Sequence, residues 1–499
     1  MGTGIASGNQ EIQSKSITRY KGVHIMSNQL NRPKQTEGFS RRTFMGGCAA
    51  FAGVSALSAL ITPTAARSEV NEIKTKIRLV FAYPSPANPI WPNIDYDFDG
   101  HNKEFLSRLQ AVSPGIEYLP AIVMSTDDAN KVVENDSEVD GYLIYFAGCL
   151  WGNAADLITD TGKPAVIADH LFAGSGEFLM SYGRAKRAGK KVLGVSSSKV
   201  EDIARAVRCI HTLKRLERSK ILVVGGNPDA RFEEFFGTKM LDVPFKELND
   251  AYDRHLGTEQ AKDLAKEWIR NAEKMMEPTR EEIDKSAAMY LAMRTVLDER
   301  EAQAIAINCL GGFYGGHIHA YPCLGFMQLD DEGCVGACEA DQRSCFVKLM
   351  MSYQTGRPGF ISDPVIDTAK NQIIYAHCVA PTKVFGPEGP SNPYHLRDHS
   401  EDRQGACDRS LMPLGEMTTT IEIIMDPKQI LFHQGVTVEN VDEDMACRNK
   451  LAVEVKGDVY KLMEGWDARG WHRVTFYGDF KREVYNLATL KGFEIVEEA

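Results

Sequence analysis

After its first 66 residues the chain lacks three features that mark common functional classes. It has no apolar run long enough to cross a membrane, no G-x-G-x-x-G motif, and no basic stripe interleaved with aromatic residues. These absences argue against a membrane-spanning protein, a dinucleotide-binding enzyme and a nucleic-acid-binding protein. The formal charge is −11 for the whole chain and −16 without the first 66 residues, which carry seven Lys or Arg against two Asp or Glu. Because an acidic surface repels phosphate backbones, we expect small neutral ligands or metal cations as partners.

The 11 cysteines lack the even, tight spacing of a disulfide framework. Cys48 falls in the N-terminal segment, and we predict that most of the other ten are buried free thiols. Cys334, Cys338 and Cys345 suggest zinc at first sight, but their spacing matches no structural zinc pattern. Since Cys334 and Cys338 also fall on a predicted buried strand, core packing is the favoured interpretation.

The N-terminal segment has the order of a twin-arginine export signal. Arg41 and Arg42 precede a mildly apolar run rich in Gly, Ala and Ser over 46–60, and small residues at 63–66 suit cleavage. The apolar run is too short for a comfortable membrane anchor. The sequence therefore predicts a signal region over 1–66, the twin-arginine export machinery as a partner, and a periplasmic or extracellular location.

The rest of the chain has ordinary globular composition, with 43% hydrophobic and 25% charged residues. Short apolar runs alternate with amphipathic segments, which predicts parallel strands joined by crossover helices. We expect a first α/β domain over 75–196 and a second over 197–362. Beyond these, alternating strands without long helices predict a mainly antiparallel β domain over 363–499.

The densest group of reactive residues lies between 308 and 341. It follows the predicted strands 304–309 and 334–338, where ligands bind in open parallel sheets. Glu339 and Asp341 are two residues apart, so in an extended chain they project to one face, where they can hold a divalent cation or divide metal-binding and base roles. The alternative is that Asp341 caps the helix predicted over 343–353.

Histidines form the second polar group of this region. His317 and His319, in a glycine-rich loop, share the two-residue spacing and are candidates for binding as well as for a structural role. A further segment, 394–399, is interpreted as a loop that lines or covers the cleft through His395 and Arg397. The alternative for that segment is a solvated surface loop.

The segments 322–341 and 363–378, with the Gly-Trp-His-Arg run at 470–473, resemble the L-fucose and L-arabinose isomerase families. The resemblance is strongest over about 304–378, looser over 415–499, and only architectural over 75–300. It implies two flavodoxin-like domains, a β-rich C-terminal domain, and a manganese-type divalent ion that assists aldose–ketose interconversion through an enediol. The sequence does not decide whether the chain forms a homo-oligomer.

The resemblance also implies roles for individual residues. Glu339, Asp341 and His472 correspond to the metal ligands, and His377 would lie near the sugar. Phe313 stands where those families carry another acidic residue, usually the metal-bound base. Either His319 or the acidic pair substitutes for that base, or the chemistry has changed.

Three functions follow from these residues. The first is an exported, metal-dependent sugar isomerase-like enzyme, with catalytic Glu339, Asp341 and His319 and with His317, His377, His395 and Arg397 binding the substrate. The second is a metal-dependent hydrolase or lyase on a modified sugar, and the third a non-catalytic sugar-binding protein. The metal site is expected at the cleft between the second and third domains.

Overall fold

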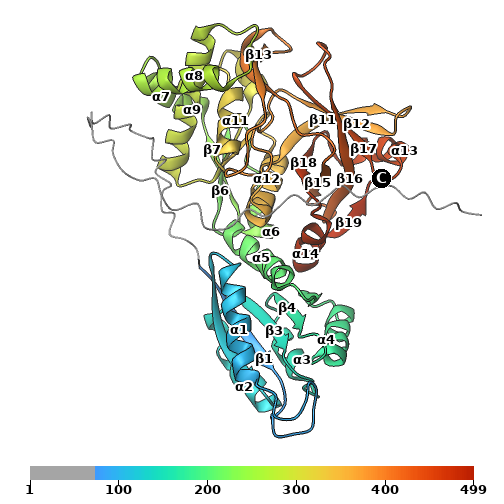
Figure 1. The fold of residues 1–499 in the computed structure, drawn as a ribbon. Coiled ribbons are helices and arrows are strands. Elements are labelled where there is room, and N and C mark those ends of the chain that lie inside the picture. The colour runs from blue at the N-terminus through green and yellow to red at the C-terminus, as the bar shows by residue number, and fades with distance from the viewer. Residues whose placement is uncertain (1–73) are drawn as a thin grey trace, which may run out of the picture. The chain divides into compact units, whose positions relative to one another are not determined.

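The computed structural model describes residues 74–499 (Figure 1). The predicted signal, with Arg41 and Arg42, lies outside the described residues, so export stays a prediction. Along the described residues, two α/β layers are followed by a mainly antiparallel β region. This confirms the predicted fold class.

The first sheet, sheet A, has five parallel strands in the order β2-β1-β3-β4-β5. This is the order of flavodoxin-like folds, in which ligands bind beyond the carboxyl ends of β1 and β3. All six residues of β3 are buried, as expected for a central strand covered on both faces. The apolar pattern did not predict β2, which contains Pro120; the proline is tolerated because β2 is an edge strand. The strands are β1 (Thr75–Ala82), β2 (Ile116–Val123), β3 (Gly141–Phe146), β4 (Ala165–Asp169) and β5 (Val192–Ser196).

Helices cover both faces of sheet A (Figure 1). Helices α1 and α5 pack on the face that carries Leu79 and Phe81, and α2, α3 and α4 pack on the face that carries Val80 and Ala82. Successive strand residues point to opposite faces, so one apolar strand supplies both layers of core. The helices are α1 (Phe98–Ala111), α2 (Thr126–Glu134), η1 (Asp136–Glu138), α3 (Ala154–Thr159), α4 (Ser175–Arg187) and α5 (Val200–Leu216).

The second sheet, sheet B, has four parallel strands in the order β10-β9-β6-β7. Read from the other side, the order is β7-β6-β9-β10, which is equivalent to β2-β1-β3-β4 in sheet A. The carboxyl ends of its strands therefore form an edge equivalent to that of sheet A. The strands are β6 (Lys220–Val224), β7 (Lys239–Val243), β9 (Ala304–Ile307) and β10 (Val335–Ala337).

Helices also cover both faces of sheet B. Helices α7, α8, α9 and α11 pack on one face and α6 and α12 on the other. Helix α9 begins at a capping box, in which Thr279 and Glu282 each accept a hydrogen bond from the other's backbone N–H. Part of the glycine-rich segment, predicted as a loop, is helix α10, which starts where the Asn308 side chain accepts from Gly311 N at 3.2 Å. The helices are α6 (Arg231–Phe236), α7 (Phe245–His255), α8 (Glu259–Asn271), α9 (Arg280–Arg300), α10 (Cys309–Gly315), α11 (Cys323–Asp331) and α12 (Gln342–Thr355).

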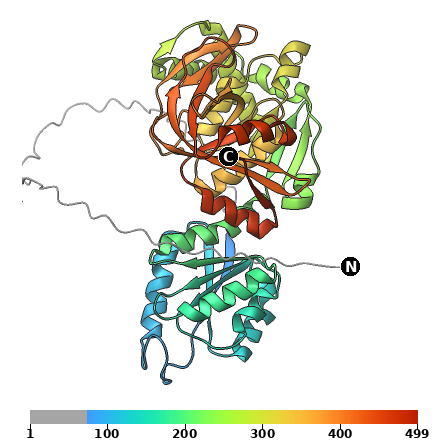
Figure 2. The same ribbon diagram turned by 90° about the vertical axis from the view of Figure 1, so that its right-hand side faces the viewer.

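Six antiparallel strands of the C-terminal region close into a ring in the order β15-β18-β11-β12-β17-β16, and β16 pairs back to β15. Strand β19 extends the sheet by pairing parallel to β16. Helix α12 packs against β15 and β18, so the ring shares a core with sheet B. Figure 2 shows the C-terminal strands, orange to red, beside the green and yellow elements of the second α/β layer. The elements are β11 (Phe360–Asp367), β12 (Gln372–His377), β15 (Met417–Ile424), β16 (Gln429–Asn440), β17 (Asn449–Val455), α13 (Val459–Gly465), η2 (Asp467–Arg469), β18 (Arg473–Tyr477), α14 (Lys481–Lys491) and β19 (Glu494–Glu497).

A fourth, small sheet joins the C-terminal region to the second α/β layer. Strand β13 (Tyr394–His399) pairs antiparallel with β14 (Gln404–Ser410) and parallel with β8 (Lys274–Met275). The prediction of a loop over 394–399 is therefore wrong. The segment is rich in polar side chains, but it is buried because those side chains find protein partners.

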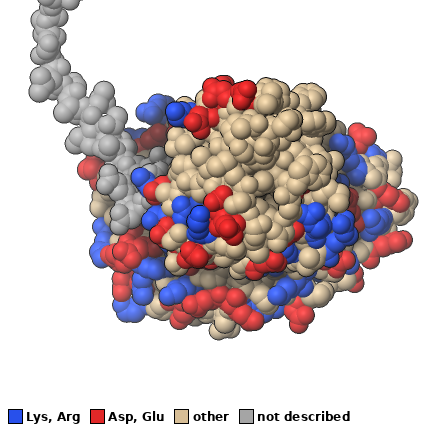
Figure 3. Space-filling view, turned by 90° about the horizontal axis from the view of Figure 1, so that it is seen from below, with Lys and Arg blue, Asp and Glu red and all other residues tan. Residues whose placement is uncertain are grey.

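No helix within residues 74–499 is long and apolar enough to span a membrane. On the face drawn in Figure 3, Lys and Arg side chains lie interspersed with Asp and Glu.

Candidate metal centre

Three side chains from distant segments converge beside the carboxyl end of sheet B. Glu339 follows β10, His377 ends β12, and His472 immediately precedes β18. One ligand atom from each lies within 4.8 Å of the others. The two Glu339 carboxylate oxygens face the two imidazoles, with Oε1 3.7 Å from His377 Nε2 and Oε2 3.7 Å from His472 Nε2.

A turn with positive φ angles directs Glu339 into this group. Glu339 has a φ of 60° and Ala340 a φ of 49°, so the chain leaves β10 in the left-handed region, where non-glycine residues are uncommon. The expectation of an extended chain that projects Glu339 and Asp341 to one face is therefore wrong. Such strained turns are maintained only where the surrounding structure requires them, often at functional sites.

Asp341 lies behind His472 instead of beside Glu339. It caps helix α12, since its Oδ1 accepts from Ser344 N at 3.0 Å and its Oδ2 from Ser344 Oγ at 2.6 Å. The same Oδ2 is 2.8 Å from His472 Nδ1. A carboxylate in this position fixes the tautomer and the orientation of an imidazole whose other nitrogen faces a metal ion.

Asp363, on β11, is a second carboxylate beside the group. Its Oδ1 lies 3.2 Å from His472 Nε2 and accepts the indole N–H of Trp471 at 2.5 Å. The sequence resemblance included Asp363 but gave it no role. The pairing of β11 with β18, which brings Ser362 opposite Arg473, places it next to His472.

The Nε2 atoms of His377 and His472 are buried, and neither has a well-directed hydrogen bond among the described residues. The nearest acceptors are Glu339 Oε1 at 3.7 Å from His377 and Asp363 Oδ1 at 3.2 Å from His472. A buried polar atom without a partner costs about 1–3 kcal/mol, so an arrangement with two of them requires an explanation. A divalent cation bound between these nitrogens and Glu339 would explain the arrangement. Carboxylate oxygen together with imidazole nitrogen suits a manganese-type ion, so the residues fit the expected group.

The charges around His472 differ sharply from those of an isolated histidine. Burial would lower the pKa of His472, but the carboxylates of Asp341, Asp363 and Glu339 raise it to about 10. Burial would likewise raise the pKa of Asp341, but His472 and Ser344 lower it to about 2. In the metal-free protein these two groups form a buried ion pair, and a metal ion must displace the His472 proton.

The two histidines of the glycine-rich segment, predicted to take part in the site, contact helix α7 instead. His319 lies on the surface with Nδ1 3.2 Å from Asp253 Oδ1, and the His317 ring stacks on Phe245 at 5.9 Å. Neither belongs to a group of potential metal ligands among the described residues. Phe313, at the position of the missing acidic residue, stacks on Tyr321 with ring centroids 4.0 Å apart.

His395 and Arg397, predicted to bind substrate, are buried on strand β13. The Arg397 guanidinium forms an ion pair with Glu277 at 2.8 Å. His395 Nε2 lies 3.7 Å from Glu273. These partners come from the segment that contains β8, so the two side chains connect the small sheet to the second α/β layer.

All ten cysteines of the described residues are free thiols, and seven of them are buried, which confirms that prediction. Cys334, Cys338 and Cys345 do not form one group: Cys334 Sγ accepts from Arg294 at 2.9 Å, and Cys345 is buried on α12. Cys338 instead meets Cys378, with the two Sγ atoms 3.6 Å apart. Nothing local in the sequence connects these two cysteines.

No family model matches the chain, and no curated protein matches it. Among solved structures the chain is similar to one titled "XylFII molecule", with 16% sequence identity over 49% of this chain and 86% of that chain and a TM-score of 0.14. A likeness at this TM-score carries no argument about function. The functional interpretation therefore depends on the residues of the site and on the resemblance of the sequence.

Proposed function

We propose that the chain is a metal-dependent carbohydrate-active enzyme of the aldose–ketose isomerase-like type. The observation that supports this is the convergence of Glu339 and Asp363 with two buried imidazole nitrogens that have no well-directed hydrogen bond among the described residues. A bound divalent cation supplies Lewis-acid polarisation of substrate oxygens at such a site.

An isomerase must also move a proton between adjacent carbons, so a base has to lie beside the ion. Glu339 is the best candidate, because about a third of its side chain is exposed, 34%, while both imidazoles are buried. Burial also raises the pKa of Glu339, which moves it toward the pH at which a general base is effective. Burial alone would raise the pKa of Asp363 too, but His472 and His377 lower it, so Asp363 stays ionised and suits a ligand. Carboxylates whose pKa values are separated in this way can divide the roles of base and ligand.

A hydrolase or lyase acting on a modified sugar is the second candidate. Phe313 and Tyr321 form an aromatic pair where the families in question carry an acidic residue, and His319 contacts Asp253 instead of the candidate centre. Hydrolysis does not require a proton to move between adjacent carbons, so it tolerates the loss of that acidic residue.

The decisive experiment combines metal analysis with exchange of substrate hydrogen. The purified wild-type protein is expected to bind one Mn²⁺ per chain and, with that ion bound, to introduce deuterium from heavy water beside the carbonyl carbon of a free sugar. Glu339→Gln is expected to lower that exchange by about 100-fold or more, the range for loss of a general base. His170→Asn serves as the matched control, because this histidine lies beyond β4 of sheet A.

The outcomes separate the two candidates. Cleavage or elimination of a modified sugar without interconversion of aldose and ketose would favour the hydrolase or lyase. Failure of the wild-type protein to bind Mn²⁺ would exclude both.

Export is proposed from the sequence alone. The double substitution Arg41→Lys and Arg42→Lys is expected to leave the precursor in the cytoplasm, as fractionation and immunoblotting would show. Normal export of that variant would contradict the assignment.

A further inference from the structure

A second group of potential ligands lies behind the candidate metal centre and consists mainly of thiols. Cys309 starts α10, Cys323 starts α11, Cys338 follows β10, and Cys378 follows β12. These four cysteines are at most 7% exposed. The fold thus gathers at one point thiols from four elements of the second α/β layer and the C-terminal ring.

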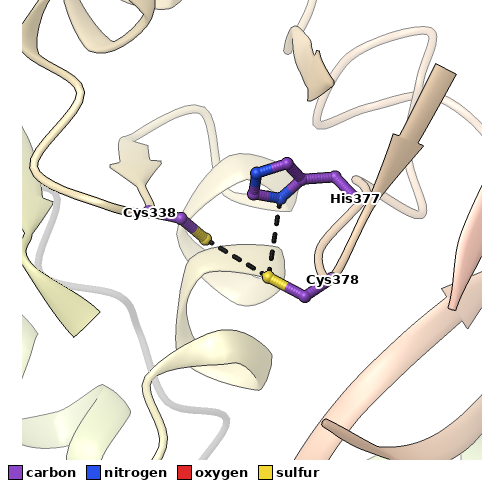
Figure 4. A group of neighbouring side chains, drawn as sticks. All are labelled: Cys338, His377 and Cys378. Carbon is purple, nitrogen blue, oxygen red and sulfur yellow. Dashed lines mark hydrogen bonds between the residues drawn. The ribbon is translucent and has the colours of Figure 1, made fainter. Parts of the chain in front are cut away.

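Cys378 is the centre of this group. Its Sγ lies 3.6 Å from Cys338 Sγ and 3.5 Å from His377 Nδ1, and Figure 4 shows these three side chains pointing toward one another. The neighbouring Cys378 thiol and burial raise the pKa of Cys323, and the neighbouring Cys309 and Cys378 thiols with burial raise the pKa of Cys338. One ligand atom each from Cys338, Cys378 and His377 lies within 4.8 Å of the others.

These separations match the edges of a tetrahedral metal site. With Zn–S bonds of about 2.3 Å and Zn–N bonds of about 2.0–2.1 Å, a tetrahedron has S–S edges of about 3.8 Å and S–N edges of about 3.6 Å. The observed values of 3.6 Å and 3.5 Å are close to both. A disulfide, by contrast, requires an S–S distance of about 2.05 Å.

We propose that Cys338, Cys378 and His377 Nδ1, with the neighbouring buried thiol of Cys323 as the fourth ligand, form a buried binding site for a thiophilic d¹⁰ cation of the Zn²⁺ or Cu⁺ class. Three sulfur ligands and one imidazole nitrogen make a closed four-ligand set of the kind that structural zinc sites use. Soft thiolate ligands also distinguish this site from the candidate centre at Glu339, whose oxygen and imidazole donors suit a harder ion.

The two sites share His377, whose Nδ1 faces the thiols and whose Nε2 faces Glu339. A neutral imidazole ligates through one nitrogen and carries its proton on the other. When the thiol site is filled, Nε2 keeps the proton and points it toward Glu339, so His377 is no longer a ligand of the second ion. His472 and Asp363 then hold that ion beside Glu339. The thiol site would therefore fix the His377 ring at the wall of the candidate centre.

The test is metal uptake by the full chain, purified under reducing conditions and freed of metal. Titration with Zn²⁺ against a chromophoric chelator is expected to show one tight site per chain, and Co²⁺ is expected to give sulfur-to-metal charge-transfer absorption. Cys378→Ser should abolish this uptake, and Cys338→Ser and Cys323→Ser should weaken it at least tenfold. Cys209→Ser is the matched control, because this thiol is buried on α5, outside the cluster.

The cobalt spectrum of the wild-type protein needs no variant, so it decides the question even if a serine variant fails to fold. Absence of sulfur-to-cobalt absorption would overturn the proposal. So would unchanged zinc uptake in Cys378→Ser, or a Cys338–Cys378 disulfide in peptides from protein purified without oxygen. Glu339→Gln should retain the zinc, which keeps this result distinct from the fate of the proposed enzyme.

Discussion

At the carboxyl end of sheet A, His101 and His170 stack face to face with ring centroids 4.0 Å apart, whereas His472, beside the carboxyl end of sheet B, contacts carboxylates. Burial, His170 and Arg108 lower the pKa of His101 to about 4, while the carboxylates around His472 raise its pKa to about 10. The two sheets share a strand order, so topology places histidines at both edges. What differs is the charge of the neighbours, and both groups of potential metal ligands among residues 74–499 lie at the second edge. Three carboxylates contact His472, and this concentration of negative charge is what makes it the candidate metal ligand of the two edges.

The largest expected effect comes from His472→Ala at the second edge. This change removes one member of a buried ion pair, which typically costs about 3–5 kcal/mol. Ser344 still satisfies Asp341, so we expect about 3 kcal/mol less stability in the metal-free protein, together with loss of the divalent ion. Urea unfolding and elemental analysis measure the two effects.

The corresponding control at the first edge is His170→Ala. It should leave metal content unchanged. Equal metal loss in both variants would mean that the two edges do not differ in the way proposed.

Asp341→Asn is expected to have the next largest effect. Asparagine still caps α12, so helix stability should change little, but the charge that orients His472 is lost. Removal of such an outer partner typically lowers metal affinity by about 10–100-fold. Isothermal titration with Mn²⁺ measures the change, and wild-type affinity in this variant would show that Asp341 acts only as a cap.

Metal binding should depend on pH at the second edge. Because the pKa of His472 is about 10 in the metal-free protein, the ring is protonated at neutral pH and must release that proton to bind the ion. Affinity for Mn²⁺ should therefore rise about tenfold per pH unit between about pH 7 and 9, and level off above pH 10. Titrations in buffers of different ionisation enthalpy count the proton released, and release of none would contradict the ion pair.

Tyr145→Phe at the first edge should have the smallest effect. The Tyr145 hydroxyl lies 3.0 Å from His101 Nε2, and loss of this neutral hydrogen bond should cost about 1 kcal/mol. Thermal unfolding measures that change. Metal content and the pH dependence of Mn²⁺ binding should be the same as in the wild-type protein, and a change in either would assign the first edge a role in the metal site.

The sequence alone predicted the alternation of strands and helices and the fold class, because the periodicity of apolar residues is a local property. It also identified Glu339 and His472, which the resemblance marked and which the structure brings to one group. Only the tertiary structure showed that the chain turns at Glu339 and Ala340, so that Asp341 supports His472 from behind. The pairing of β11 with β18 brought Asp363 to the site, and the approach of β12 to β10 placed Cys378 against Cys338. These contacts join residues between 40 and 131 positions apart, and packing of distant elements, which no local pattern records, decides them.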